Sequence, residues 1–257
     1  MSVSETYCTA FWILPVPTNT TKEDFQAKCE ALVESILALP VAQKNFIKFD
    51  ILFQNDQMKN YMASVGLPEP QPCVCLRCYY ETDANWAACL QDPDFINAMA
   101  AGRSWGFYDG VCIFSADPIT KLDSSVPADT NVVIGIFKIP VAQTASIFRQ
   151  KLDALIDTVL NLKKPMMNMT MLVQNLNAEQ NLQAAGYPAS QPAIVVINEF
   201  QTFNDVAKLA NDLGVQSVVA QAMKDFGFQA NSVVFSADLK NKFTGPTAYA
   251  LYIELLL

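Results

Sequence analysis

The chain repeats itself with a period of about 120 residues. The residues that recur 120 positions later are Gln54-Asn55, Gly66, Pro68 and Gln71-Pro72. The run Phe-Ser-Ala-Asp at 114–117 returns 121 positions later, at 235–238. Such a period is that of a domain rather than of a solenoid repeat of about 20–50 residues. We therefore predict a tandem duplication, with one unit over residues 1–123 and a second over residues 124–257.

The apolar pattern predicts the same order of elements, β-α-β-β-α-β, in both units. Strands are expected at 7–14, 46–54, 73–80 and 108–115, and again at 131–139, 166–174, 193–200 and 231–236. Apolar residues from Phe25 to Leu37 have the spacing of one helix face, and that spacing returns from Phe148 to Leu160. This order is typical of the ferredoxin-like unit, in which helices cover one face of an antiparallel sheet.

The second face of each predicted sheet also needs to be covered, and two sheets that face each other would achieve this. We predict an α+β fold in which two tandem ferredoxin-like (βαββαβ) units form a barrel within one chain, while further self-association stays open. Residues 118–129 are rich in turn formers and are predicted to link the units. The run 247–256 is predicted to add a C-terminal strand at a sheet edge.

Composition and charge narrow the range of partners. The chain is 51% hydrophobic and 16% charged, which argues against disorder. Its apolar runs are far shorter than the roughly 20 residues that span a bilayer, so no membrane partner is expected. A formal charge of −8 argues against nucleic acid. The first residues lack the basic segment of a secretory signal, so we expect a cytoplasmic protein.

The chain contains no histidine. This excludes Ser-His-Asp and Cys-His nucleophilic sites, histidine-ligated metals and haem with a proximal histidine. Cys73, Cys75 and Cys78 are close in sequence, but strand alternation sends Cys78 to the opposite face, which favours free thiols over the alternative of a metal site. No phosphate-binding glycine motif is present. We expect neither a metal nor a cofactor.

Strand alternation points to one group of candidate site residues. In the strands at 46–54 and 73–80, one face is apolar and should meet the helices, so that the other face lines the barrel. The candidate substrate-binding residues on the inward faces of these strands and their copies are Lys48, Asp50, Arg77, Tyr79, Asn168, Thr170 and Glu199. Buried polar groups of this kind are costly unless they are paired or used. Such a lining therefore suggests a ligand cavity, with an ion pair of Arg77 with Asp50 or Glu199 as the structural alternative.

The sequence also resembles a known superfamily. The stretch from Tyr79-Tyr80-Glu81 through Trp86 and Leu90 to Asp92-Pro93-Asp94-Phe95 resembles the strand-to-helix passage of the dimeric α+β barrel proteins, especially EthD-like and antibiotic-biosynthesis-monooxygenase-like members. The resemblance covers nearly the whole chain. It implies a small-molecule site in each half or between the sheets, used in relatives for oxidation, cyclisation, isomerisation or dehalogenation without a metal. Relatives that use histidine or haem are poor models for this chain.

Two functions remain open at this point. The first is binding and cofactor-independent oxidation, cyclisation or isomerisation of a small hydrophobic metabolite, aromatic or polyketide-like, in the barrel cavity. Asp50 or Glu199 would then act as the base, and Arg77 or Tyr79 would stabilise an enolate or carboxylate. The alternative is a stress-responsive or ligand-binding barrel protein without catalysis. Trp12 and Phe137, which match across the two copies, are expected to fill the core.

Overall fold

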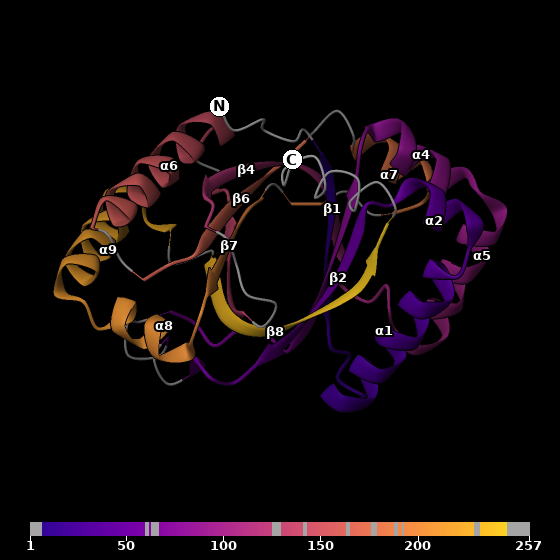
Figure 1. The fold of residues 1–257 in the computed structure, drawn as a ribbon, viewed down its shortest axis with the longest axis horizontal. Coiled ribbons are helices and arrows are strands. Elements are labelled where there is room, and N and C mark those ends of the chain that lie inside the picture. Colours follow the sequence, from indigo (N-terminus) through magenta and orange to yellow (C-terminus); the bar gives the residue numbers. More distant parts are fainter. Residues whose placement is uncertain are drawn as a thin grey trace, which may run out of the picture.

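The computed structural model describes residues 7–59, 62, 67–124, 130–140, 143–162, 165–175, 179–187, 190–191, 193–228 and 232–245. The described strands close into one barrel, in the order β1-β3-β2-β8-β5-β7-β6-β4. Helices cover two opposite sides of this barrel (Figure 1). The fold is therefore α+β and contains two ferredoxin-like units, which confirms the predicted fold class and the closure of the barrel within one chain.

The two halves contain matching elements. The first half consists of β1 (Cys8–Pro15), α1 (Lys22–Leu37), α2 (Pro40–Asn45), β2 (Lys48–Asn55), β3 (Cys73–Tyr80), α4 (Asp83–Gln91), α5 (Pro93–Ala101), the 3₁₀ helix η1 (Gly102–Trp105) and β4 (Cys112–Leu122). The second half consists of β5 (Asn131–Lys138), α6 (Ala145–Asn161), β6 (Asn168–Gln174), α7 (Glu179–Ala184), β7 (Ala193–Phe200), α8 (Phe203–Ala210), α9 (Leu213–Phe226) and β8 (Ser232–Thr244).

Helix caps fix the correspondence between the halves. Thr82 and Thr202 lie at the N-caps of α4 and α8, 120 positions apart. Asp92 and Asp212 lie at the N-caps of α5 and α9, again 120 positions apart, and each accepts hydrogen bonds from backbone N–H groups of the first turn. Equivalent residues in these helices therefore differ by 120 in number.

The register of the first strands corrects one sequence prediction. Cys8 pairs with Tyr80 in the first half, and Asn131 pairs with Phe200 in the second, so equivalent positions in β1 and β5 differ by 123. Trp12 therefore corresponds to Gly135, and the prediction that it matches Phe137 is wrong. The error arose because β1 continues to Pro15, whereas β5 already ends at Lys138, before the second proline.

Strands β4 and β8 join the two sheets. Strand β4 pairs with β1 as far as Ala116 and with β6 as far as Leu122. In the same way, β8 pairs with β5 and then with β2. Residues 118–122 of the predicted linker are thus part of a strand. Pro118 is tolerated there because the described pairing with β1 has already ended, so that β4 needs no N–H group on that side.

Strand β4 also starts later than predicted, at Cys112 rather than at residue 108. The segment before it forms turns, in which Gly106 and Gly110 have φ angles of 86° and 69°. Glycine adopts such angles without a steric penalty, which explains why the chain turns here before the strand begins. The predicted C-terminal strand at 247–256 lies outside the described residues.

The described residues form three apolar cores that stabilise the barrel. One fills its interior and includes Phe11, Leu52, Phe114, Leu172 and Phe235. The other two lie between the sheet and the helices of each half. Segments are exchanged between these outer cores: Leu182 and Tyr187 of the second half pack in the first core, and Met58 and Met62 of the first half pack in the second. No described helix has the length and apolar character needed to cross a membrane.

Candidate ligand-binding site

The helix-covered core of the first half is filled by aromatic rings. Trp86 lies at the centre, with its ring centroid 5.3 Å from that of Trp12 and 6.0 Å from that of Phe95. The rings of Tyr80 and Trp86 are stacked at 5.9 Å. The full group, here called the aromatic cluster, comprises Trp12, Phe46, Phe49, Tyr80, Trp86 and Phe95. All six side chains are buried, so this half has a densely packed core.

The equivalent positions of the second half carry smaller side chains. In the order of the aromatic cluster, the counterparts are Gly135, Met166, Met169, Phe200, Val206 and Val215. Of the six, Phe200 alone keeps an aromatic ring. Replacing a tryptophan with glycine and another with valine removes much of the volume that fills the first core.

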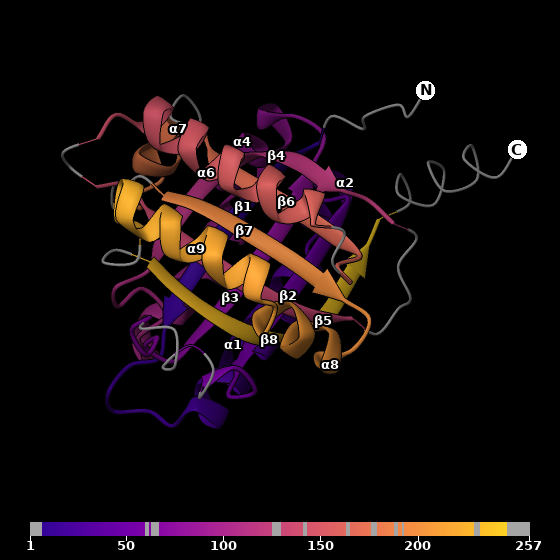
Figure 2. The ribbon, with the colours of Figure 1, turned by 90° about the vertical axis from the view of Figure 1, so that its left-hand side faces the viewer.

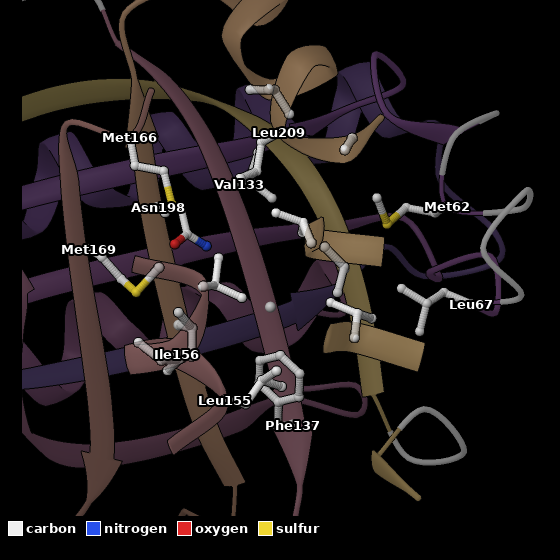
Figure 3. A pocket seen from close by; sticks show the side chains of 18 of the residues that line it. Met62, Leu67, Val133, Phe137, Leu155, Ile156, Met166, Met169, Asn198 and Leu209 are labelled. Atoms are coloured by element: carbon white, nitrogen blue, oxygen red, sulfur yellow. The ribbon is translucent and has the colours of Figure 1, made fainter. Parts of the chain in front are cut away.

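A cavity of about 490 Å³ occupies the corresponding place. It lies between the sheet and helices α6, α8 and α9, which lie on the same side of the barrel in Figure 2. All six counterparts of the aromatic cluster line it. Met58, Met62 and Leu67, which belong to the first half, also line it, and Figure 3 shows Met62 and Leu67 together on one side. The exchanged segment of the first half is therefore part of the cavity wall.

Gly135 and Phe137 shape the floor of the cavity. A Cβ atom at Gly135 would lie 2.7 Å from Cε2 of Phe137, closer than side chains approach one another. The Phe137 ring thus lies over the glycine, where the first half has the side chain of Trp12. A side chain at position 135 would displace this ring and change the shape of the cavity.

The cavity wall is almost entirely apolar. Among its described lining residues, the polar side chains are those of Asn198 and Gln216, and none is charged. Gln216 Nε2 donates a hydrogen bond to the backbone oxygen of Ala210 at 3.0 Å. Asn198 Oδ1 is buried and accepts no hydrogen bond. The described part of this wall can hold an apolar molecule, but it offers no titratable group for acid–base chemistry.

The predicted site residues lie elsewhere, at one end of the barrel. Asp50 is fully buried and is surrounded by donors. It accepts hydrogen bonds from Arg77 Nη2 at 2.8 Å and Nε at 3.2 Å, and from Asn241 Nδ2 at 3.1 Å. Lys48 Nζ lies 3.2 Å from the same carboxylate. The structure thus pairs Arg77 chiefly with Asp50, within the first half.

Glu199 approaches this group from the opposite wall. Strands β3 and β7 lie four places apart in the closed barrel, and Arg77 Nη2 is 4.0 Å from Glu199 Oε1 across the interior. Asn168 Nδ2 donates to Glu199 Oε2 at 3.2 Å. The Tyr79 ring lies 5.0 Å from the Arg77 guanidinium. Together with Lys48 and Asp50, these residues form what we call the barrel-end cluster, while Thr170 lies two residues further along β6 from Asn168.

Charge pairing fixes the protonation states in the barrel-end cluster. Burial alone would raise the pKa of Asp50, but the charges of Arg77 and Lys48 outweigh it and hold this pKa below its ordinary value. Burial raises the pKa of Tyr79 well above its ordinary value, although Arg77 opposes this. Asp50 therefore stays ionised and is a weak proton acceptor, which favours the structural role for this residue.

Inward-facing strand residues could not have revealed the cavity, because it lies on the outer face of the sheet. The available signal was the loss of aromatic residues between equivalent positions, such as Trp86 and Val206, 120 residues apart.

Among the described residues, no three histidine, cysteine, aspartate or glutamate side chains lie together as metal ligands.

Comparison with known proteins shows the fold. No protein-family model matches the chain, and no curated protein does so. An anthrone oxidase-like protein has a TM-score of 0.61 at 8% identity, with 94% of this chain and 95% of that chain covered. A monooxygenase candidate from Fusobacterium nucleatum has a TM-score of 0.58 at 8% identity, with 94% and 96% covered. A monooxygenase candidate from Lactobacillus acidophilus has a TM-score of 0.52 at 8% identity, with 94% of this chain and 98% of that chain covered. The chain has the dimeric α+β barrel fold.

Proposed function

We propose that the protein binds a small apolar molecule in the cavity of its second half. The observation that carries this proposal is the contrast between the halves: six equivalent positions form an aromatic cluster in one and line a cavity of about 490 Å³ in the other. Protein interiors are normally close-packed, so a cavity at a place that the fold can fill calls for an explanation. Its volume lies within the range of small-molecule sites, about 300–1,000 Å³.

The composition of the wall fits such a ligand. Five of the described residues that line the cavity are methionines: Met58, Met62, Met166, Met169 and Met223. Methionine side chains are flexible and polarizable, so they adapt to different apolar shapes and favour contact with aromatic rings. This supports an aromatic or polyketide-like ligand. The anthrone oxidase-like neighbour agrees with that choice, although at 8% identity it shows only the fold.

Titration with pyrene, whose fluorescence reports the polarity around it, tests the proposal. The wild-type protein should bind pyrene with a shift to an apolar emission spectrum. Val206→Trp, which introduces the residue found at Trp86, should abolish binding because the new ring fills the cavity. Leu213→Trp adds the same ring on the same side of the barrel, at a residue that is 80% exposed, and should bind as the wild type does. Equal binding by both variants would refute the proposed site.

The barrel-end cluster is a second candidate, for cofactor-independent conversion of a bound metabolite. Glu199 favours it, because this carboxylate keeps 17% of its side-chain surface exposed while facing Arg77 and Tyr79. In this proposal Glu199 removes a proton from the substrate and Arg77 stabilises the resulting enolate. Glu199→Gln should then abolish turnover of an aromatic substrate with little effect on pyrene binding. If turnover persists in this variant, Glu199 is not the base.

A further inference from the structure

Strand β5 carries its aromatic residue two positions later than β1 does. By strand register, Gly135 corresponds to Trp12, and Phe137 corresponds to Leu14. The first half therefore has a large ring followed by an aliphatic side chain, whereas the second half has no side chain at the first position and a ring at the second. This exchange opens the space that Trp12 fills in the first core and brings a different ring beside it.

The gap above Gly135 holds part of the Phe137 ring. Gly135 pairs with Val196 on β7 and with Val234 on β8. Directly paired residues have their side chains on the same face of a sheet, so the glycine leaves a gap between two valines. A Cβ atom at Gly135 would lie 2.7 Å from Cε2 and 2.9 Å from Cζ of Phe137. The far edge of the ring therefore occupies this gap.

The Phe137 ring also borders the cavity. The described lining residues include three phenylalanines, Phe137, Phe200 and Phe228, whose exposed fractions are 9%, 1% and 4%. Phe137 thus has the largest accessible surface of these three rings. In Figure 3 it lies on the side of the cavity away from Met166 and Leu209. Phe137 therefore bounds the cavity in this direction.

We infer that Phe137, positioned by Gly135, sets the size of the molecule that the cavity accepts. The inference rests on the proposed function, since it concerns the same cavity. A smaller side chain at position 137 would leave the gap above Gly135 empty and extend the cavity towards the sheet. A side chain at position 135 would push the ring out of the gap. Because Val196 and Val234 stand on either side, the ring would then move into the cavity and reduce it.

Fluorescence titrations with naphthalene, pyrene and perylene, a series of aromatic hydrocarbons of increasing size, test this inference. Phe137→Leu introduces the residue found at Leu14. It should change the ratio of the dissociation constants of perylene and pyrene by about ten-fold in favour of perylene, a typical effect of a small volume change in an apolar pocket. Gly135→Ala should weaken pyrene binding by about ten-fold and leave naphthalene binding unchanged. Phe203→Leu makes the first substitution on α8, outside the described cavity wall, and should behave as the wild type.

The double variant Gly135→Ala/Phe137→Leu shows whether the glycine acts through the ring. In this variant the new methyl group has no ring to displace, so the double variant should recover the pyrene binding that Gly135→Ala loses. A double variant that binds pyrene as weakly as Gly135→Ala does would refute the positioning role of Gly135.

The outcomes separate the inference from the function on which it rests. If the wild-type protein binds these compounds, but Phe137→Leu and Gly135→Ala keep its ratios of dissociation constants, the role of Phe137 is wrong while the cavity remains a binding site. If none of the three compounds binds the wild-type protein, the proposed function itself fails. Thermal unfolding of each variant, followed by circular dichroism, checks that the fold is retained, and either single variant that folds tests the inference by itself.

Discussion

Trp86 and Val206 hold the same place in the two halves of the barrel. Each follows a threonine N-cap by four residues and lies in a helix packed on its own sheet. Trp86 is the centre of the aromatic cluster, whereas Val206 lines the cavity. The two halves thus share one backbone arrangement, which encloses a filled core in the first half and a cavity in the second.

Trp86→Val should destabilise the protein strongly. The change opens a cavity among the remaining rings of the aromatic cluster, and buried tryptophan truncations of this kind cost about 3–5 kcal/mol. Val206→Ala is the matched control, because it removes little from a wall that already borders a cavity and should cost clearly less. Urea unfolding measures both free energies. Similar losses for the two variants would show that the halves do not differ in packing as we describe.

Arg77→Met should also destabilise the protein, because Asp50 would keep its buried charge without its main partner. Removing one member of a buried ion pair typically costs about 3–5 kcal/mol. The double variant Asp50→Leu/Arg77→Met removes both charges and should recover most of that loss. Denaturant unfolding tests this. A double variant that is no more stable than Arg77→Met would contradict the purely structural role of the pair.

The stability of the protein should depend on Asp50 in acid. Its pKa is lowered in the folded state from an ordinary value of 3.8, so the ionised carboxylate stabilises the fold above that value. As the pH falls below it, the unfolded chain binds the proton first, and the stabilisation is lost progressively down to the folded pKa. Asp50→Asn should therefore lose less stability than the wild type between about pH 5 and pH 2. Parallel pH profiles of the two proteins would show that Asp50 makes no such contribution.

The predicted units 1–123 and 124–257 should not fold separately. Strands β2 and β8, and β4 and β6, pair across the two halves, and Met58 and Leu182 each pack in the core of the other half. Each unit alone would expose these strand edges and apolar surfaces. Co-expressed units should form a one-to-one complex in size-exclusion chromatography, while each unit alone aggregates. Two monomeric, folded units would show that the halves are independent domains.

Much of the fold could be predicted from periodicity. The spacing of apolar residues in 25–37 and 148–160 predicts both long helices, and β3 and β7 have the predicted bounds. Strand ends were harder to predict. Pro118 reads as a turn residue in sequence, and its place in a strand depends on which neighbour β4 has at that point. That information is tertiary and is not contained in the local pattern.

The sequence predicted the barrel-end cluster because alternation along a strand places side chains on one face. It could not predict that Asp50 would be surrounded by donors, since Asn241 reaches it from β8, 191 residues away in the chain. The cavity was missed for a different reason. It arises from small residues at places where the other half has rings. The 120-residue period shows this for Trp86 and Val206, but the alignment of Trp12 with Gly135 needs the strand register.

A crystal structure of the protein grown with pyrene tests the central claim most directly. We predict electron density for the ring system between the sheet and helices α8 and α9, in contact with Met169 and Val206, and none beside Glu199 at the barrel end. Density at the barrel end, or a protein without bound pyrene at saturating concentration, would contradict the account.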